Sequence, residues 1–388
     1  MNVQTPLALL GGLSARAFMR RHWQRRPLLV RAAWPGIEPP LGRAALFRLA
    51  ARDEVESRLV VRSGRRWSVE HGPLARRRLP ALATPDWTLL VQGLDLHVPA
   101  ARRLLDAFRF VPDARLDDLM ISWAARGGGV GPHLDSYDVF LLQVHGRRRW
   151  RIGRAADPAF VPGLPLRILR RFEPEGEWVL EPGDLLYLPP RWAHDGVALD
   201  DGCMTCSVGF RAPAAGEVAR ALLARLGDAP ADDRGAGAAL YRDPGMPATP
   251  TPGAIPPALQ AFARSAVERL VATPDALERA LGEWLSEPKP QVWFARDGAA
   301  ARAAGEAARC AVRLDRRTRM LYDERHVYLN GESYRASGRD ARLMRRLADE
   351  RRLDAAERGR LSAPARAQVA QWLADGWLHP AGGESDEA

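Results

Sequence analysis

The sequence predicts a chain of mixed α and β structure that opens with a small β-barrel or β-sandwich and continues with helices. Residues 1 to about 212 alternate short apolar runs, such as Trp87–Gln92 and Val139–Val144, with glycine, proline and aspartate. Many short strands at this spacing are typical of a sandwich or small barrel. From Ala214 onward the apolar residues recur at helical intervals, which indicates a change of architecture.

The first region reads as a helix followed by strands. Phe18, His22 and Trp23 precede Pro27, and this order predicts a helix that leads into a strand at 28–30. Further strands are expected at 119–123, 139–144, 150–152, 185–188 and 206–210.

The middle region is predicted to be helical. Val218, Leu222 and Leu226 have helical spacing, and the spacing returns at 259–271 and 277–285, until Pro288 ends the segment. The connection between these helices, 229–257, is rich in proline, glycine, alanine and aspartate. So small a helical unit buries little apolar surface alone, and we expect it to pack on a neighbouring part or on a second subunit.

The last region combines a small sheet with helices. Strands are expected at 312–314 and 327–329, and Asn330-Gly331 signals a tight turn. Helices are expected at about 343–353 and 363–373, the second with Ser362 as its N-cap. This mixture indicates a winged-helix type of fold. The predicted division is therefore 1–213, 214–290 and 291–388.

Composition limits the class of protein. The 388 residues are 46% hydrophobic and 27% charged, with no apolar run of about 18 residues and no charged-then-apolar leader, so neither a membrane span nor a secretion signal is predicted. The expected location is the cytoplasm. The net charge of +10 fits an RNA-bearing partner. Because Lys289 is the single lysine among 57 basic residues, the charge equally fits an arginine-biased composition on a solvated surface.

One histidine, one aspartate and a second histidine predict a metal site. His133 and Asp135 are two residues apart, so on an extended strand both side chains face the same side. His194 follows 59 residues after Asp135, at the end of a proline-containing strand. Two imidazoles and one carboxylate on one face of an octahedron are the ligand set of non-haem Fe(II) oxygenases. Each histidine taken alone is also explained by a structural role, as a hydrogen-bonded side chain that binds no metal.

Three further side chains are candidates for the same cavity. Arg148 alternates with Trp150 and Ile152 on an apolar face, where an arginine needs a carboxylate partner, and a dicarboxylate co-substrate would provide one. An internal ion pair is the alternative. Ser122 lies on a preceding strand and Tyr137 shares the parity of His133 and Asp135. Tyr137 is therefore a candidate substrate contact, although a tyrosine that only lines the barrel fits the pattern nearly as well.

These residues lie in motifs that closely resemble the bacterial ribosomal oxygenases of the Jumonji-C cupin superfamily. The matching segments within 15–213 are Asp118-Leu-Met-Ile-Ser-Trp, Gly127-Gly-Gly-Val-Gly-Pro-His-Leu-Asp-Ser-Tyr-Asp-Val-Phe, Gly146-Arg-Arg-Arg-Trp-Arg-Ile-Gly, Glu181-Pro-Gly-Asp-Leu-Leu-Tyr-Leu-Pro-Pro and Ser207-Val-Gly-Phe-Arg-Ala-Pro. The segment 200–206 fits the family less well than its surroundings.

The resemblance implies an α+β chain with a double-stranded β-helix (cupin) domain, a helical dimerisation region that makes a homodimer, and a C-terminal winged helix. It implies an Fe(II)- and 2-oxoglutarate-dependent dioxygenase that hydroxylates an arginine side chain of a ribosomal protein of the large subunit. In this resemblance His133, Asp135 and His194 hold the iron, and Arg148 and Ser122 receive the distal carboxylate of 2-oxoglutarate. Ribosomal RNA is a further possible contact, and no membrane partner is expected.

Three other functions compete with this interpretation. One alternative is a Jumonji-type demethylase, which uses the same barrel. A second is a metal-binding cupin without redox activity, such as an isomerase or a sugar sensor. The pairing of His-x-Asp with an inward arginine disfavours a non-redox cupin, whose sites commonly use more histidines and a glutamate. A third alternative treats the C-terminal unit as a DNA-binding regulator, because 342–352 carries five arginines.

Overall fold

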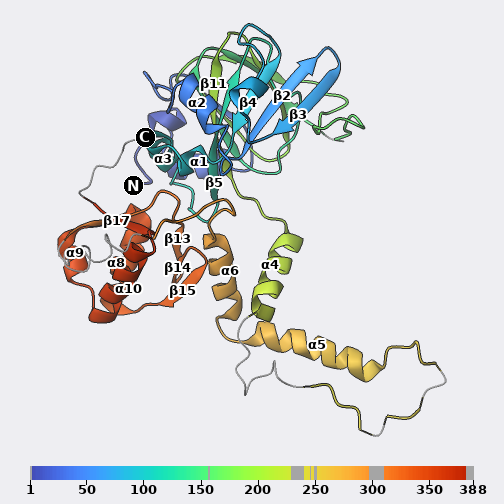
Figure 1. The fold of residues 1–388 in the computed structure, drawn as a ribbon, viewed down its shortest axis with the longest axis vertical. Helices are drawn as coiled ribbons and strands as arrows, with labels where there is room; N and C mark the ends of the chain where they lie inside the picture. Colours follow the sequence, from blue (N-terminus) through green and yellow to red (C-terminus); the bar gives the residue numbers. More distant parts are fainter. Residues whose placement is uncertain are drawn as a thin grey trace. The chain divides into compact units, whose positions relative to one another are not determined.

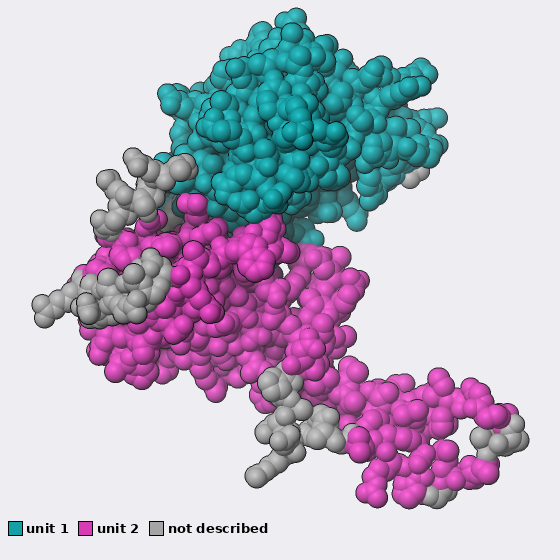
Figure 2. All heavy atoms as spheres, in the orientation of Figure 1, with its two compact units in different colours: residues 1–212, 386–388 teal, residues 213–385 magenta. Residues whose placement is uncertain are grey.

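A computed structural model describes residues 2–155, 158–228, 240–244, 246–248, 251–296 and 310–381 of the chain. The chain divides into two compact units, residues 1–212 and residues 213–385, which Figure 2 colours separately. Residues 229–239, 245, 249 and 250 of the predicted connection 229–257 lie outside the described residues.

Unit 1 combines short helices with eleven described strands (Figure 1). Its helices are α1 (Ala15–Arg21), α2 (Arg43–Leu49) and α3 (Pro99–Asp106), with short 3-10 turns at Ala8–Leu10, Arg76–Arg78 and Leu94–Leu96. Its strands are β1 (Leu28–Val30), β2 (Ser57–Ser63), β3 (Arg66–His71), β4 (Trp87–Val91), β5 (Leu116–Ala124), β6 (Val139–His145), β7 (Arg148–Arg154), β8 (Gly176–Leu180), β9 (Leu185–Leu188), β10 (Trp192–Ala198) and β11 (Cys203–Phe210).

The strands form two antiparallel sheets. Eight of them pair in the order β1-β9-β6-β11-β5-β4-β2-β3, and the other three pair as β10-β7-β8. The inner faces of the two sheets share one apolar cluster, which includes Leu141 on β6, Trp150 and Ile152 on β7, and Leu186 on β9. Two sheets that enclose a common core confirm the predicted β-barrel type of domain.

The opposite face of the large sheet carries a second, larger core. Phe18 of α1, Phe47 of α2 and Leu105 of α3 pack there with sheet residues such as Trp87 and Phe140. Because side chains alternate along a strand, β6 and β9 contribute residues to both cores. Strand β11, in the middle of the sheet, is accordingly buried along its whole length.

Unit 2 contains the predicted helices and two small antiparallel sheets. Its described helices are α4 (Ala215–Asp228), α5 (Pro257–Ala272), α6 (Ala276–Ser286), α8 (Gly338–Glu350), α9 (Ala355–Gly359) and α10 (Ala363–Ala374). The strands β13 (Met320–Tyr322), β14 (His326–Leu329) and β15 (Glu332–Arg335) form one sheet, and β16 (Arg352–Leu353), β12 (Val312–Leu314) and β17 (Leu378–Pro380) form the other.

The turn and the helix cap predicted in this unit are confirmed, and one predicted helix has different bounds. Asn330 and Gly331 both have positive φ between β14 and β15, as a tight hairpin requires. The Ser362 side chain accepts a hydrogen bond from the Ala365 amide and caps α10. The helix expected at about 343–353 instead spans Gly338–Glu350, because Arg351 adopts φ 58° and ends it before β16.

Helix α6 packs directly on the β13-β14-β15 sheet. A side chain on Gly282 would place its Cβ 2.2 Å from the Tyr328 ring, so only glycine allows this approach. The Ser286 hydroxyl accepts a hydrogen bond from the Gly331 amide at the hairpin turn. Within the described residues, no helix is long and apolar enough to cross a membrane.

Candidate metal and co-substrate site

His133 and His194 meet across a two-residue bridge at one end of the barrel. The amide of each donates a hydrogen bond of 3.0 Å to the carbonyl oxygen of the other. His194 lies on β10, whereas His133 lies in an extended segment that forms only this isolated bridge. The imidazole centroids are 4.2 Å apart.

Both imidazoles are oriented by the backbone. The Nδ1–H of His133 donates to the Gly131 carbonyl at 2.9 Å, and the Nδ1–H of His194 donates to the Trp192 carbonyl at 3.0 Å. These bonds leave each Nε2 lone pair free for a ligand. The two Nε2 atoms lie 4.0 and 3.6 Å from the two carboxylate oxygens of Asp135. One ligand atom from each of the three residues lies within 4.8 Å of the others, so the structure brings the predicted trio together.

His194 is held in its neutral form. Its side chain is 3% exposed, and burial, followed by the charge of His133, lowers its pKa to about 4. The neighbouring Asp195 faces away from the trio and accepts a 2.5 Å hydrogen bond from Arg151. Asp195 is therefore paired with an arginine and is not one of the three clustered ligand groups.

The glycine run before His133 permits a close backbone approach. A Cβ on Gly128 would lie 2.2 Å from the Trp87 carbonyl oxygen, and one on Gly129 would lie 2.4 Å from the Gly196 carbonyl oxygen. Gly196 itself lies opposite Trp150 on the neighbouring strand. Residues without side chains are thus needed to hold the His133 segment beside β10.

Arg148 lies in the same barrel, beyond Trp150. Its guanidinium carbon is 5.8 Å from the Trp150 ring, which is in turn 5.8 Å from the His194 ring. The β7–β10 register pairs Arg148 with Ala198 and Ile152 with His194, so the arginine starts roughly 13 Å along the strand from the histidine. The residue is 5% exposed, and its Nε and Nη2 atoms are buried without a hydrogen-bond partner.

Three neighbouring polar side chains lie on the inner face of the large sheet. The register places Ser122, Thr205 and Gln143 side by side on β5, β11 and β6, with the apolar Leu90 of β4 next to Ser122. The Ser122 hydroxyl donates to the Thr205 carbonyl at 3.5 Å, and the Thr205 hydroxyl donates to Gln143 at 2.9 Å. Ser122 and Thr205 are both buried, so the barrel interior contains hydroxyl groups as well as a guanidinium.

Tyr137 stands at a more open position than the other candidates. It is 40% exposed and follows Asp135 in a bend rather than a strand. Burial of the hydroxyl and the negative charges of Asp135 and Asp118 raise its pKa. A Cβ on Gly209 would lie 3.9 Å from an Asp118 carboxylate oxygen and 4.0 Å from the Tyr137 ring, so both side chains border Gly209.

The donor set and its surroundings suit particular chemistry. Two neutral imidazoles and one carboxylate fit a first-row divalent metal such as Fe(II) and leave coordination positions open. A buried guanidinium without a partner is costly, and a carboxylate would satisfy it. A small diacid that also binds the metal meets both requirements.

Trp150, which strand alternation predicted on the face of Arg148, lies between Arg148 and His194. Sequence reasoning missed two residues near the site, Thr205, which hydrogen-bonds beside Ser122, and Asp118, which carries charge near Tyr137. Strand parity was the available signal for Asp118, because it shares the parity of Ser122.

Two family models match the chain. One describes a JmjC domain and matches residues 103–218, and the other describes a ROXA-like winged helix and matches residues 269–379. The chain is 38% identical over 277 residues to the ribosomal protein uL16 3-hydroxylase of Escherichia coli strain K12, which covers 71% of this chain and 72% of that protein. It is 39% identical over 208 residues to a probable ribosomal oxygenase of Haemophilus influenzae, covering 52% and 50%.

Solved structures give the same relationship. The crystal structure of the E. coli ribosomal oxygenase YcfD matches with a TM-score of 0.78 and 32% identity, over 94% of this chain and 97% of that one. The structure of YcfD in complex with cobalt and 2-oxoglutarate matches with a TM-score of 0.78 and 31% identity, over 95% and 99%.

Proposed function

This chain belongs to the JmjC family of ribosomal oxygenases, and from that membership we propose that it hydroxylates an arginine side chain of a large-subunit ribosomal protein. The chain is a 2-oxoglutarate-dependent oxygenase that uses a metal ion and dioxygen. The observation that carries the proposal is the buried, unpartnered guanidinium of Arg148 in the same barrel as the His133, Asp135 and His194 trio. A ribosomal substrate implies that the enzyme works in the cytoplasm.

Each site residue has one role in this proposal. His133, Asp135 and His194 hold Fe(II) through two nitrogens and one oxygen. Arg148 binds the distal carboxylate of 2-oxoglutarate as a charge-assisted pair, and Ser122 adds a hydroxyl donor to it. When bound, the iron and 2-oxoglutarate convert dioxygen into the oxidant that inserts one oxygen atom, with succinate and carbon dioxide as by-products. The enclosed barrel wall around Trp150 excludes water from the reacting groups.

Negative charge beside Tyr137 supports an arginine as the substrate side chain. Asp118 and Asp135 both place negative charge near the Tyr137 ring, and the buried Asp118 carboxylate also accepts a hydrogen bond from the Gly93 amide. A guanidinium stacks on an aromatic ring and is attracted by nearby negative charge, so the exposed Tyr137 ring suits a cationic, planar group. We assign substrate contact to Tyr137 on this basis.

Residue-resolved mass spectrometry tests the proposal. The full chain is loaded anaerobically with Fe(II) and 2-oxoglutarate, mixed with a peptide of the cognate uL16 protein, and exposed to air. The expected result is the gain of one oxygen on an arginine. Loss of a methyl group from a methylated peptide would indicate a demethylase instead, and no change in any peptide, with metal bound, would reject the proposed substrate class.

The helical region, residues 214–290, is proposed to form a homodimer. Helix α5 has no buried residue, and Leu259, Val267 and Val271 on it are all at least 36% exposed. These three residues recur at intervals of eight and four, so they share one stripe of the helix. An exposed apolar stripe on a regular helix suits a second copy of the same surface.

A further inference from the structure

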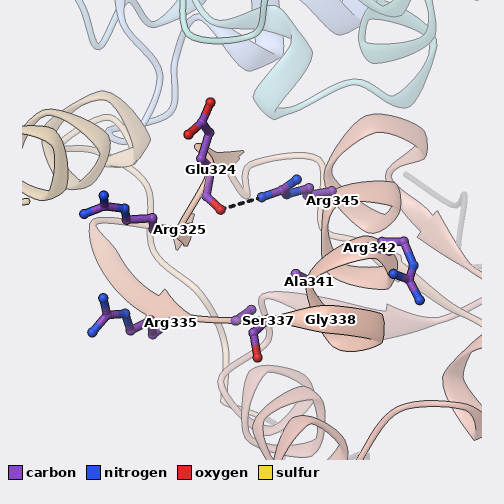
Figure 3. Close-up of a pocket in the computed structure, with 9 residues that line it drawn as sticks. Glu324, Arg325, Arg335, Ser337, Gly338, Ala341, Arg342 and Arg345 are labelled. Atoms are coloured by element: carbon purple, nitrogen blue, oxygen red, sulfur yellow. Dashed lines mark hydrogen bonds between the residues drawn. The ribbon is translucent and has the colours of Figure 1, made fainter.

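An arginine-lined hollow lies in unit 2, next to the start of α8. Its volume is about 810 Å³. Figure 3 shows Arg325 and Arg335 on one side of it, and Arg345 and Arg342 on the helix at the other. The remaining lining residues are Glu324, Ala336, Ser337, Gly338 and Ala341. The lining contains no large apolar side chain.

The hollow carries an excess of positive charge. Arg325 and Arg335 share a single carboxylate, that of Asp275 at the start of α6. Among the described residues, neither Arg342 nor Arg345 has an ion-pair partner, and Figure 3 shows Arg345 bound to the backbone oxygen of Glu324. In Figure 3 the guanidinium of Arg345 reaches across the hollow, whereas those of Arg325, Arg335 and Arg342 extend outward from its rim. Four arginines thus surround the hollow, with the carboxylates of Glu324 in its lining and of Asp275 beside it.

The guanidinium of Arg345 is held in place before any ligand arrives. Its Nη2 donates to the carbonyl oxygens of Asp323 and Glu324 at 3.0 and 2.8 Å. Its Cζ lies 5.5 Å from the centroid of the Tyr322 ring. Because neutral groups hold this arginine, its charge is not cancelled, and less side-chain entropy is lost when an anion binds.

Two other arginines of the same unit are neutralised by carboxylates. Arg346, on α8 like Arg342, pairs with Glu350 and Glu357, and Arg317 pairs with Asp315. Arg346 is therefore a matched reference for Arg342, since both lie on α8 and only Arg346 is paired.

We propose that this hollow binds the phosphate backbone of single-stranded RNA. Guanidinium groups are preferred phosphate ligands, and a polyanion satisfies several of them at once. An acidic protein is a poorer fit, because protein interfaces have an apolar or aromatic centre that this lining lacks.

RNA is also a better fit than duplex DNA. Winged-helix proteins that read DNA place a helix in the major groove. The exposed residues of α10, the last helix of the fold, include only one cation, Arg366, alongside Ala363, Pro364, Ala367 and Gln371. The choice of RNA rests in part on the proposed function, since a ribosomal protein is assembled with RNA.

The test measures binding of a fluorescein-labelled, mixed-sequence single-stranded RNA of twelve nucleotides to the full chain, by anisotropy at several salt concentrations. Arg342→Gln is expected to weaken binding about fivefold and to reduce the slope of log affinity against log salt by about 0.7. The matched control Arg346→Gln removes an equal charge from the same helix and is expected to change affinity less than twofold. Equal effects of the two variants would overturn the proposal.

A second pair of variants tests for a gain in RNA affinity, which a damaged fold would not produce. Asp275→Asn releases Arg325 and Arg335 and is expected to tighten RNA binding roughly threefold, whereas Glu350→Gln, with the same change of charge, is not. Asparagine tolerates the positive φ of 62° at residue 275. Tighter binding of duplex DNA, or equal competition by poly-glutamate, would contradict an RNA site. Peptide hydroxylation by the same variants is expected to be unchanged, so the hydroxylase and RNA proposals fail separately.

Discussion

The backbone amides of His133 and His194 each donate to the carbonyl of the other residue, so the two imidazoles project from one closed pair of hydrogen bonds. Their Nδ1–H groups are fixed by carbonyls two residues upstream, at Gly131 and Trp192. Both ligand positions are therefore set by the backbone before a metal arrives.

Removal of the carboxylate ligand should strongly weaken metal binding. Asp135→Ala leaves two nitrogen ligands, and we expect the affinity for Co(II), measured by titration calorimetry, to fall by roughly 100-fold or more, with succinate release at background. Asp200→Asn is the control, because that carboxylate pairs with exposed Arg147. Undiminished succinate release by Asp135→Ala would refute the iron assignment.

Arg148 should govern the affinity for the co-substrate. Arg148→Gln removes a charge-assisted pair, and we expect the 2-oxoglutarate concentration for half-maximal rate to rise between about 10- and 100-fold, with metal affinity retained. The control is Arg147→Gln, at the residue that precedes β7 and pairs with Asp200. An unchanged 2-oxoglutarate dependence in Arg148→Gln would remove this arginine from the site.

The metal-free protein should lose stability in mild acid. Native His194 stays neutral down to about pH 4, whereas the unfolded chain protonates this histidine near pH 6.5. Between these values the unfolded state binds more protons, so the free energy of unfolding falls as the pH drops, by about 3 kcal/mol in total. Urea unfolding in chelator at several pH values measures this, and His194→Gln should lack that part of the decrease. Parallel curves for the two proteins would contradict the buried neutral histidine.

Gly129 should not tolerate a side chain. A Cβ on residue 129 would lie 2.4 Å from the carbonyl oxygen of Gly196, a backbone atom that cannot rotate out of the way. We expect Gly129→Ala to lower the free energy of unfolding by about 1–3 kcal/mol and to weaken metal binding, because it pushes the His133 segment away from β10. Gly216→Ala, in α4 with open space around it, serves as the control and should be neutral or slightly stabilising. Normal metal binding by stable Gly129→Ala protein would show that the approach is not needed.

The exposed stripe of α5 should control the oligomeric state. Val267→Glu places a charge at a position that is 49% exposed in one chain and would be buried in a dimer. Light scattering coupled to size-exclusion chromatography should report a dimer for the parent and a monomer for the variant. Glu268→Gln, the adjacent polar position, is the control. A monomeric parent protein would contradict the proposed homodimer.

Patterns of local origin were predictable from the sequence, and contacts between distant segments were not. Strand alternation placed Arg148 with Trp150, and Ser362 marked the start of α10, because both signals depend on nearby residues. The capping box Asp354-Ala-Ala-Glu357, which begins α9, was also readable and was overlooked.

Other features arise only from tertiary register. Ser122 lies beside Thr205 because β5 pairs with β11, and Gly282 faces Tyr328 because α6 crosses a hairpin. Neither neighbour is implied by spacing along the chain. The bend that carries Tyr137 likewise replaces the continuous strand expected from parity.

The large sheet of unit 1 has one packed core on each face, and only one of them surrounds the candidate site. Consecutive side chains on its central strands therefore point to different faces, one toward the candidate site and one toward the core under the helices. Substitutions that adapt the enzyme to another target can accumulate at every second position, while the intervening positions preserve the scaffold. Divergence among descendants of this domain should accordingly alternate along each strand, with a period of two residues.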